Sequence, residues 1–310
     1  MDEKVNDNVI ADENLLSFLK DSIAIPDETE IIYQYTNIDA LFDGIVVKEP
    51  EENKEICLWA SSYMYLNDPS EIATGQKYFN EILSQHFIEQ NNDTDIVDSI
   101  NDMEFFITSF STTIDSLPMW SMYGKNGSGI ALGFDRNIIH KGKGSDDALY
   151  KCVYLDDDLK NEITFLCESY KKENTIEEGE KIADEALILL FIIVLFALIL
   201  NKDEKFIKEQ LEDYIIPFLL FIIFAKDPAY KYENEVRLLV HSDKDLAVQY
   251  RSKNNLIIPY IENFFPKEAL KEIWIGPTND MKRTRKSLET YLSHMGFSDV
   301  KIHESSVPYR

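Results

Sequence analysis

The pattern of apolar and polar positions predicts strands near both ends of the chain and helices in its middle. Strand-like runs lie at 31–35, 55–62, 103–113, 128–135 and 148–155, and another lies at 233–241. The C-terminal part adds a strand at 255–260 and a strand, helix and strand between 271 and 303. Strands and helices that are segregated in this way are typical of an α+β fold.

A helix is predicted after the segment LNDPSE. Asp68 suits the N-cap position, Pro69 suits the first helical position, and Glu71 stands where a capping box places its carboxylate. These three residues need no function beyond starting a helix. Starting a helix does not explain Asn67, which either binds a ligand or caps the preceding turn.

Two apolar runs lie inside a long helical region that extends from about 156 to 225. They are ALILLFIIVLFALIL at 186–200 and IIPFLLFIIFA at 215–225. Both are shorter than the roughly 18 to 20 apolar residues of a membrane-spanning helix, and Pro217 interrupts the second. We expect buried core helices that pack on each other or on a partner subunit, with a short membrane hairpin as the alternative.

No linker, low-complexity tract or internal repeat divides the 310 residues, which predicts a single domain with a helical insertion at about 156–228. The net charge of −25 opposes binding of duplex nucleic acid, because phosphate binding requires Lys and Arg. A small molecule or a basic macromolecule is the expected partner; the family resemblance described below implies a small-molecule nucleotide. The cysteines lack paired metal spacing and the acidic N-terminus lacks an apolar segment, which favours a cytoplasmic protein.

The segment YENEVRLLVH carries the first candidate chemistry. Read as a strand, it places Glu233, Glu235 and Arg237 on one face. That face is either solvated, with an internal ion pair, or it lines a site. In a site, paired carboxylates suit reactions that build positive charge on a sugar carbon, and Arg237 would hold one of them ionised.

The segment MWSMYGKNGSGIALGFD carries the second candidate. Trp120 and Tyr123 stand three residues apart on a short helix and project to one side, and the glycines that follow let the backbone turn into the next strand. The rings form either an aromatic pair in the core or the floor of a pocket for a flat ring. In TSFSTT, Ser109 and Ser111 share one strand face. No P-loop, G-x-G-x-x-G or H-E-x-x-H motif is present, so no metal is expected.

Several motifs occur together in an order that resembles a widespread bacterial family of unknown function, domain-of-unknown-function family 2971. They are YQYT, LNDPSE, SFS, MWSMYGKNGSGIALGFD, YENEVRL and EIWIG, and the resemblance extends from about Tyr33 to Gly276. The combination of N-D-P-x-E, M-W-x-x-Y and E-x-E-x-R is the specific part of it. The insertion with the two apolar runs is longer than the family leads us to expect.

The chain is also similar, more distantly, to ADP-ribosyltransferases. Those enzymes cleave NAD with a strand that bears Arg, His or Tyr, a strand with a Ser-Thr-Ser-like run, and a strand that ends in Glu, often as E-x-E. The segments IYQYT, SFSTT and ENE follow the same order here. They depart from the pattern because no Arg or His stands in the first segment and SFSTT is not Ser-Thr-Ser. The resemblance implies a mixed, mainly antiparallel β core of ADP-ribosyltransferase-like type.

The same resemblance implies roles for individual residues. Glu235 would stabilise the ribosyl cation and Glu233 would orient the acceptor, so these are the candidate catalytic residues. The resemblance also implies Tyr33 or Tyr35 for the adenosine end or the phosphates and Ser109 or Ser111 for the nicotinamide ribose. Trp120 and Tyr123, which belong to the motifs of the family of unknown function, would stack on nicotinamide. Asn67 and Arg237 complete the candidate ligand-binding residues on the sequence grounds given above.

The resulting hypothesis is an ADP-ribosyltransferase-like protein that binds NAD and cleaves or transfers its ADP-ribose, as a toxin or anti-phage defence effector. A protein acceptor or a partner subunit would dock on the apolar helices at 186–200 and 215–225. The rival hypothesis is a non-catalytic nucleotide-binding, interaction or oligomerisation module. A third is a glycoside or nucleoside hydrolase that uses the same carboxylates.

Overall fold

The structure is a computed structural model of the full chain. It describes residues 18, 21–66, 74–75, 77–78, 81, 105–140, 148–173, 220, 223–241, 247–253 and 255–309. The start of the predicted helix at Asp68 and most of both apolar runs lie outside these residues. None of the helices formed by the described residues is long and apolar enough to cross a membrane.

The chain divides into two compact units. Unit 1 comprises Met1–Ala24, Asp68–Met103 and Cys152–Pro228, and unit 2 comprises Ile25–Asn67, Glu104–Lys151 and Ala229–Arg310. In its described part, unit 1 contains the helix α7 (Asp157–Glu173) and a parallel pair of short strands, β6 (Val153–Tyr154) and β7 (Ala225–Lys226). The prediction of a single domain with a helical insertion stays a prediction.

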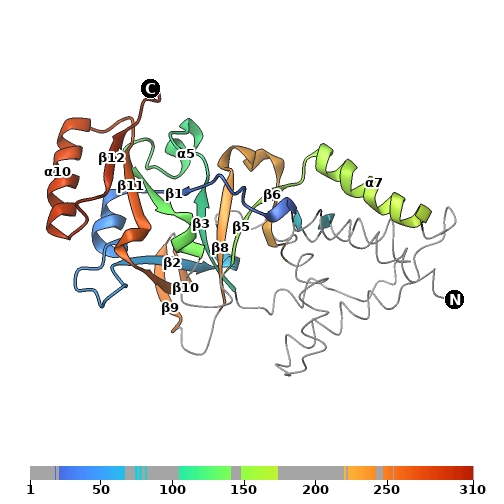
Figure 1. Ribbon diagram of the computed structural model, residues 1–310, viewed down its shortest axis with the longest axis horizontal. Coiled ribbons are helices and arrows are strands. Elements are labelled where there is room, and N and C mark those ends of the chain that lie inside the picture. Colours follow the sequence, from blue (N-terminus) through green and yellow to red (C-terminus); the bar gives the residue numbers. More distant parts are fainter. Residues whose placement is uncertain are drawn as a thin grey trace. The chain divides into compact units, whose positions relative to one another are not determined.

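Unit 2 is built on a mainly antiparallel sheet, which confirms the predicted α+β class (Figure 1). The strand order is β12-β11-β4-β1-β3-β2-β10-β9, and β8 pairs with β3 and with β5. The bounds are β1 Ile31–Thr36, β2 Ile56–Ser62, β3 Phe105–Ser111, β4 Ile130–Asp135, β5 Ala148–Lys151, β8 Glu235–His241, β9 Gln249–Lys253, β10 Leu256–Phe265, β11 Leu270–Ile275 and β12 Lys301–Glu304. Among the strands that the described residues form in this sheet, only β11 and β12 pair in parallel.

The sheet forks at β3. One edge of β3 pairs with β8 from Phe105 to Ser111. The other edge is shared, because β1 pairs with it at Ser111 and β2 pairs with it at Ile107 and Phe106. Two arms of the sheet, one that begins with β1 and one that begins with β2, therefore diverge from β3. Every described candidate residue lies in unit 2.

One face of the sheet carries the main hydrophobic core. Strand side chains at alternate positions, such as Ile32, Leu132 and Leu238, are fully buried there. The helices α6 (Arg136–His140) and α10 (Met281–His294) and the helical turn η1 (Leu41–Ile45) contribute further apolar side chains to this cluster. Figure 1 shows α10 beside β12 at one edge of the unit. Burial of each large apolar side chain stabilises the fold by about 1.5–3 kcal/mol.

The opposite face of the sheet is more polar and carries a smaller aromatic cluster. The short helix α5 (Leu117–Met122) packs there through Met119 and Trp120, against Tyr35 of β1 and Ala131 of β4. This face holds all the described candidate residues. Its arrangement depends on strand pairing between segments that are far apart in the sequence.

Three predicted elements differ from those observed. The strand predicted at 148–155 is two strands, β5 and β6, which break at Cys152 and belong to different sheets. The strand predicted from residue 233 begins at Glu235, because Pro228–Glu233 form the 3-10 turn η3. The strand predicted at 255–260 extends to Phe265. The short strand β9, which precedes it, was not predicted from the sequence.

Candidate functional site

The candidate site is organised by the register of three neighbouring strands. Tyr33 of β1 lies opposite Ser111 of β3, and Ser111 lies opposite Glu235 of β8. Ser109 lies opposite Arg237 in the same ladder. Directly opposed residues of antiparallel strands project from the same face. The structure therefore brings these five residues, from three predicted segments, to one face of the sheet.

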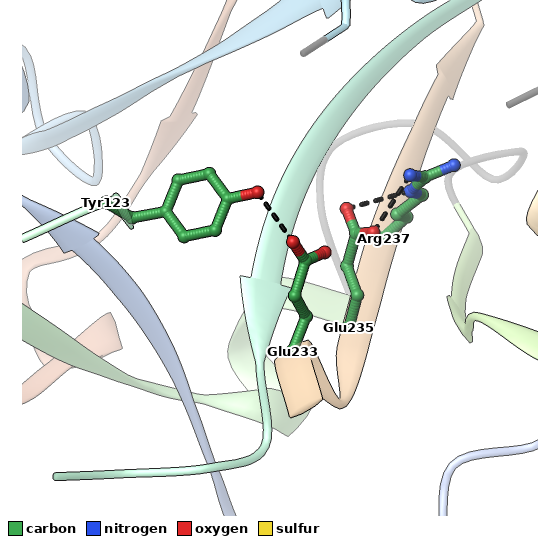
Figure 2. A network of polar contacts seen from close by, with 4 residues as sticks. All are labelled: Tyr123, Glu233, Glu235 and Arg237. Atoms are coloured by element: carbon green, nitrogen blue, oxygen red, sulfur yellow. Dashed lines mark hydrogen bonds and ion pairs between the residues drawn. The ribbon is translucent and has the colours of Figure 1, made fainter. Parts of the chain in front are cut away.

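Glu235 and Arg237 form a buried ion pair within β8 (Figure 2). Arg237 Nε donates to Glu235 Oε1 at 2.9 Å and Arg237 Nη2 donates to Glu235 Oε2 at 2.8 Å, which makes the contact bidentate. Glu235 is 7% exposed and Arg237 is 1% exposed. The two charges are therefore enclosed, and the alternative of a solvated strand face is wrong for this pair.

Glu233 enters the site from η3 rather than from β8, which corrects the prediction that it shares a strand face with Glu235. Asn234 separates them with a positive φ of 41°, a conformation that Asn tolerates better than most residues. Asn234 Nδ2 donates to Thr113 Oγ1 at 2.7 Å, and its carbonyl accepts from the Thr112 backbone N–H at 3.0 Å. The two threonines that follow β3 thus hold Asn234, and with it the backbone between the two glutamates, in place.

The Glu233 side chain is buried and is held by Tyr123. The Tyr123 hydroxyl donates to Glu233 Oε1 at 2.6 Å, as Figure 2 shows. The Ser111 hydroxyl donates to the Glu233 carbonyl at 2.6 Å, and Ser111 is fully buried. Ser111 and Tyr123 thus fix the backbone and the side chain of Glu233 from two different elements.

Trp120 of α5 packs in the aromatic cluster between this helix and the sheet. Its side chain is fully buried, and its ring meets Tyr35 edge-on with the centroids 4.9 Å apart. Its Nε1 donates to Asp115 Oδ1 at 2.9 Å. Burial raises the pKa of Tyr35 to about 12. These contacts are those of a core residue, and stacking of Trp120 on nicotinamide stays a prediction.

Tyr33 reaches across β4 to a carboxylate on β11. Its hydroxyl donates to Glu272 Oε1 at 3.0 Å, and Trp274 Nε1 donates to the same oxygen at 2.9 Å. Burial, with the nearby Glu272 charge, raises the pKa of Tyr33. Gly133 makes this path possible, because a Cβ there would lie 2.7 Å from Glu272 Cγ and 3.1 Å from Tyr33 Cε1.

Asn67 lies outside the described residues. Sequence reasoning missed Asn234, which the strand pattern placed on an apolar face, and Glu272, whose partner lies 239 positions away. Asn tolerates the left-handed backbone conformation found in turns, so Asn234 carried a local signal. No local feature of the sequence indicates that Glu272 contacts Tyr33. Among the described residues, no group of three or more His, Cys, Asp or Glu side chains is placed to hold a metal ion.

Comparison with known proteins matches the middle of the chain to a family. Residues 119–238 match the model of a family described as a protein of unknown function (DUF2971). This segment contains the M-W-x-x-Y and E-x-E-x-R motifs, so the family resemblance is confirmed over this part of the chain. No curated protein and no solved structure matches the chain.

Proposed function

We propose that this chain is an ADP-ribosyltransferase-like protein that binds NAD and cleaves it or transfers its ADP-ribose. The observation that carries the proposal is the register of β1, β3 and β8, in which Tyr33, Ser111 and Glu235 occupy opposed positions on one face. The same residue types, in the same order along the chain, define the resemblance to ADP-ribosyltransferases. A role as a toxin or anti-phage defence effector is part of the same proposal.

The reaction breaks the N-glycosidic bond of NAD, and the bonding electron pair leaves with nicotinamide. Positive charge then develops on C1′ of the ribose. The Glu235 carboxylate stabilises this charge directly or through the ribose 2′-hydroxyl. Arg237 fixes the orientation of the carboxylate through two hydrogen bonds, and its positive charge favours the ionised form.

Glu233 acts on the acceptor in this proposal. A nucleophile adds to C1′ and gives its proton to the Glu233 carboxylate, which the Tyr123 hydroxyl orients. Water as the nucleophile gives free ADP-ribose, and a protein side chain gives an ADP-ribosylated protein. In both cases the products are nicotinamide, the ADP-ribosyl product and one proton.

Release of nicotinamide from NAD by the full-length chain tests the proposal. Glu235→Gln is expected to lower the rate by about 10²–10³-fold, as the loss of one transition-state contact does in other enzymes. Glu268→Gln is the matched control, because Glu268 is exposed on the turn Lys267–Ala269, and it is expected to retain the wild-type rate.

Glu235→Gln also removes half of a buried ion pair, so the double variant Glu235→Gln/Arg237→Gln separates chemistry from folding. This double variant leaves no buried charge of the pair behind, and we expect it to be folded and inactive. A wild type that releases no nicotinamide with water or with varied protein acceptors contradicts the proposal.

A non-catalytic nucleotide-binding or interaction module is the second candidate function. It is favoured by the burial of Glu235 and Ser111 and by the use of the Ser111 hydroxyl in an internal hydrogen bond. Residues committed to internal contacts can shape a binding surface without reacting. Saturable NAD binding by calorimetry, together with intact NAD in the same sample, would support this candidate over the enzyme.

A further inference from the structure

Arg251 is the one residue of β9 that is not exposed. It lies on the same sheet face as the candidate site, but in the arm of the sheet that β2, β10 and β9 form. Its opposed residue on β10 is Ile258, and Tyr260 lies two positions further on that strand. Tyr260 in turn lies opposite Ser61 of β2. Residues from β9, β10 and β2 therefore gather around the Arg251 guanidinium.

Two aromatic rings lie beside this guanidinium. Its central carbon lies 5.4 Å from the centroid of the Trp59 ring and 6.0 Å from that of Tyr260, and the two rings lie 4.5 Å apart. Arg251 Nη2 donates to Ser61 Oγ at 2.7 Å. Arg251 Nε is shielded from solvent and makes no hydrogen bond to any described residue.

Arg251 has no acidic partner in the described part of the chain, although the sequence contains 56 Asp and Glu residues against 31 Lys and Arg. Burial lowers the pKa of Arg251. A half-buried charge without a counter-ion opposes folding. Contact with aromatic rings recovers only part of this loss. Such an arrangement suits a ligand that brings its own negative charge.

We propose that Arg251, Trp59 and Tyr260 form a binding site for a nucleotide, in which Arg251 binds a phosphate group and the base stacks on Trp59. A guanidinium binds phosphate oxygens through paired N–H donors. Trp59 is 37% exposed, so part of its ring is available for stacking. This site lies outside the Glu235 site, and the inference holds whether or not the chain cleaves NAD.

Calorimetric titration of the full-length chain with ADP, adenosine and inorganic phosphate tests the site. We expect ADP to bind at least about 10-fold more tightly than adenosine, because charge-assisted hydrogen bonds to a phosphate are strong. Arg251→Gln is expected to abolish this preference, and Trp59→Ala is expected to weaken ADP and adenosine alike. Inorganic phosphate should bind more weakly than ADP, since it has no ring to stack.

Arg283→Gln is the matched control, because it removes one positive charge from an exposed position on α10. This variant should bind ADP as the wild type does. Either equal affinities of the wild type for ADP and adenosine, or an unchanged ADP affinity in Arg251→Gln, would overturn the inference.

Arg251→Met distinguishes a ligand-binding arginine from one that merely packs. Since it removes a charge that lacks an acidic partner among the described residues, we expect an unchanged or higher melting temperature together with loss of the preference for ADP. A melting temperature that falls while ADP affinity stays the same would show that Arg251 only supports the fold.

Discussion

The ion pair between Glu235 and Arg237 is the dominant feature of the site at the scale of single residues. Both side chains are enclosed, and both nitrogen–oxygen contacts are shorter than 3 Å. A buried pair of this kind contributes little over an apolar pair of the same size, whereas loss of one partner is costly. The pair therefore constrains the fold more than it stabilises it.

Single and double substitutions of this pair are expected to be strongly non-additive. Glu235→Gln and Arg237→Gln should each lower the free energy of unfolding by about 3–5 kcal/mol, because each leaves the other charge without this partner. The double variant should lose clearly less than the sum of the two. Urea unfolding followed by circular dichroism measures all three values, and additive losses would argue against the coupled buried pair.

Gly133 gives a second prediction at the scale of residues. Gly133→Ala places a methyl group within 2.7 Å of Glu272 Cγ, so we expect a loss of about 1–3 kcal/mol in the free energy of unfolding. Gly44→Ala is the control, since the nearest atom, Trp59 Cζ2, lies at an ordinary 3.7 Å and the residue is helical. The control should be neutral or slightly stabilising. Equal effects of both substitutions would contradict the close packing of Tyr33 over β4.

At the scale of elements, α5 is held in place by the loop that precedes it. Asp115 accepts hydrogen bonds from Trp120 Nε1, from the Ser305 hydroxyl, and from the backbone N–H and the hydroxyl of Ser306. Burial alone would raise the pKa of Asp115, but these hydrogen bonds outweigh it and hold the pKa below its ordinary value. One carboxylate therefore ties the β3–α5 loop to the C-terminal segment.

This contact predicts a defined pH dependence. Because the pKa of Asp115 is lower in the folded state than the unfolded value of about 3.9, the unfolded state binds more protons between the two values. The stabilisation by Asp115 is thus complete above about pH 5 and is lost as pH falls through the folded pKa. Asp115→Asn should be less stable than the wild type at pH 7, and the difference should shrink below about pH 4.

Thermal unfolding at a series of pH values measures this difference, with Asp299→Asn as an exposed control. The control should follow the wild type at every pH. A deficit in Asp115→Asn that persists unchanged at pH 3 would indicate that the carboxylate charge is not what holds the loop.

At the scale of the whole molecule, the net charge of −25 dominates the electrostatics. Repulsion among surface carboxylates opposes the compact state and is screened by salt over about 8–10 Å at physiological ionic strength. We expect the melting temperature to rise between 20 mM and 500 mM sodium chloride at pH 7. Differential scanning calorimetry measures this shift, and a melting temperature that falls with salt would show that attractive ion pairs outweigh the repulsion.

Much of the fold could be predicted because the signals are local. The apolar pattern predicted β1 to β4, and the final strand, helix and strand appear where this pattern put them. The break at Cys152 and the turn before Glu235 were not predictable in this way. Both interrupt a run of residues that is locally compatible with a single strand.

The sequence by itself determined which side chains share a strand face, since this follows from the period of two along a strand. It thereby placed Glu235 with Arg237 and Ser109 with Ser111. Only the tertiary structure decided that the face of Glu235 and Arg237 is enclosed, that Glu233 leaves the strand, and that Tyr33, Ser111 and Glu235 are aligned. Burial and register depend on pairing between segments far apart in the chain, and no local pattern of residues encodes that pairing.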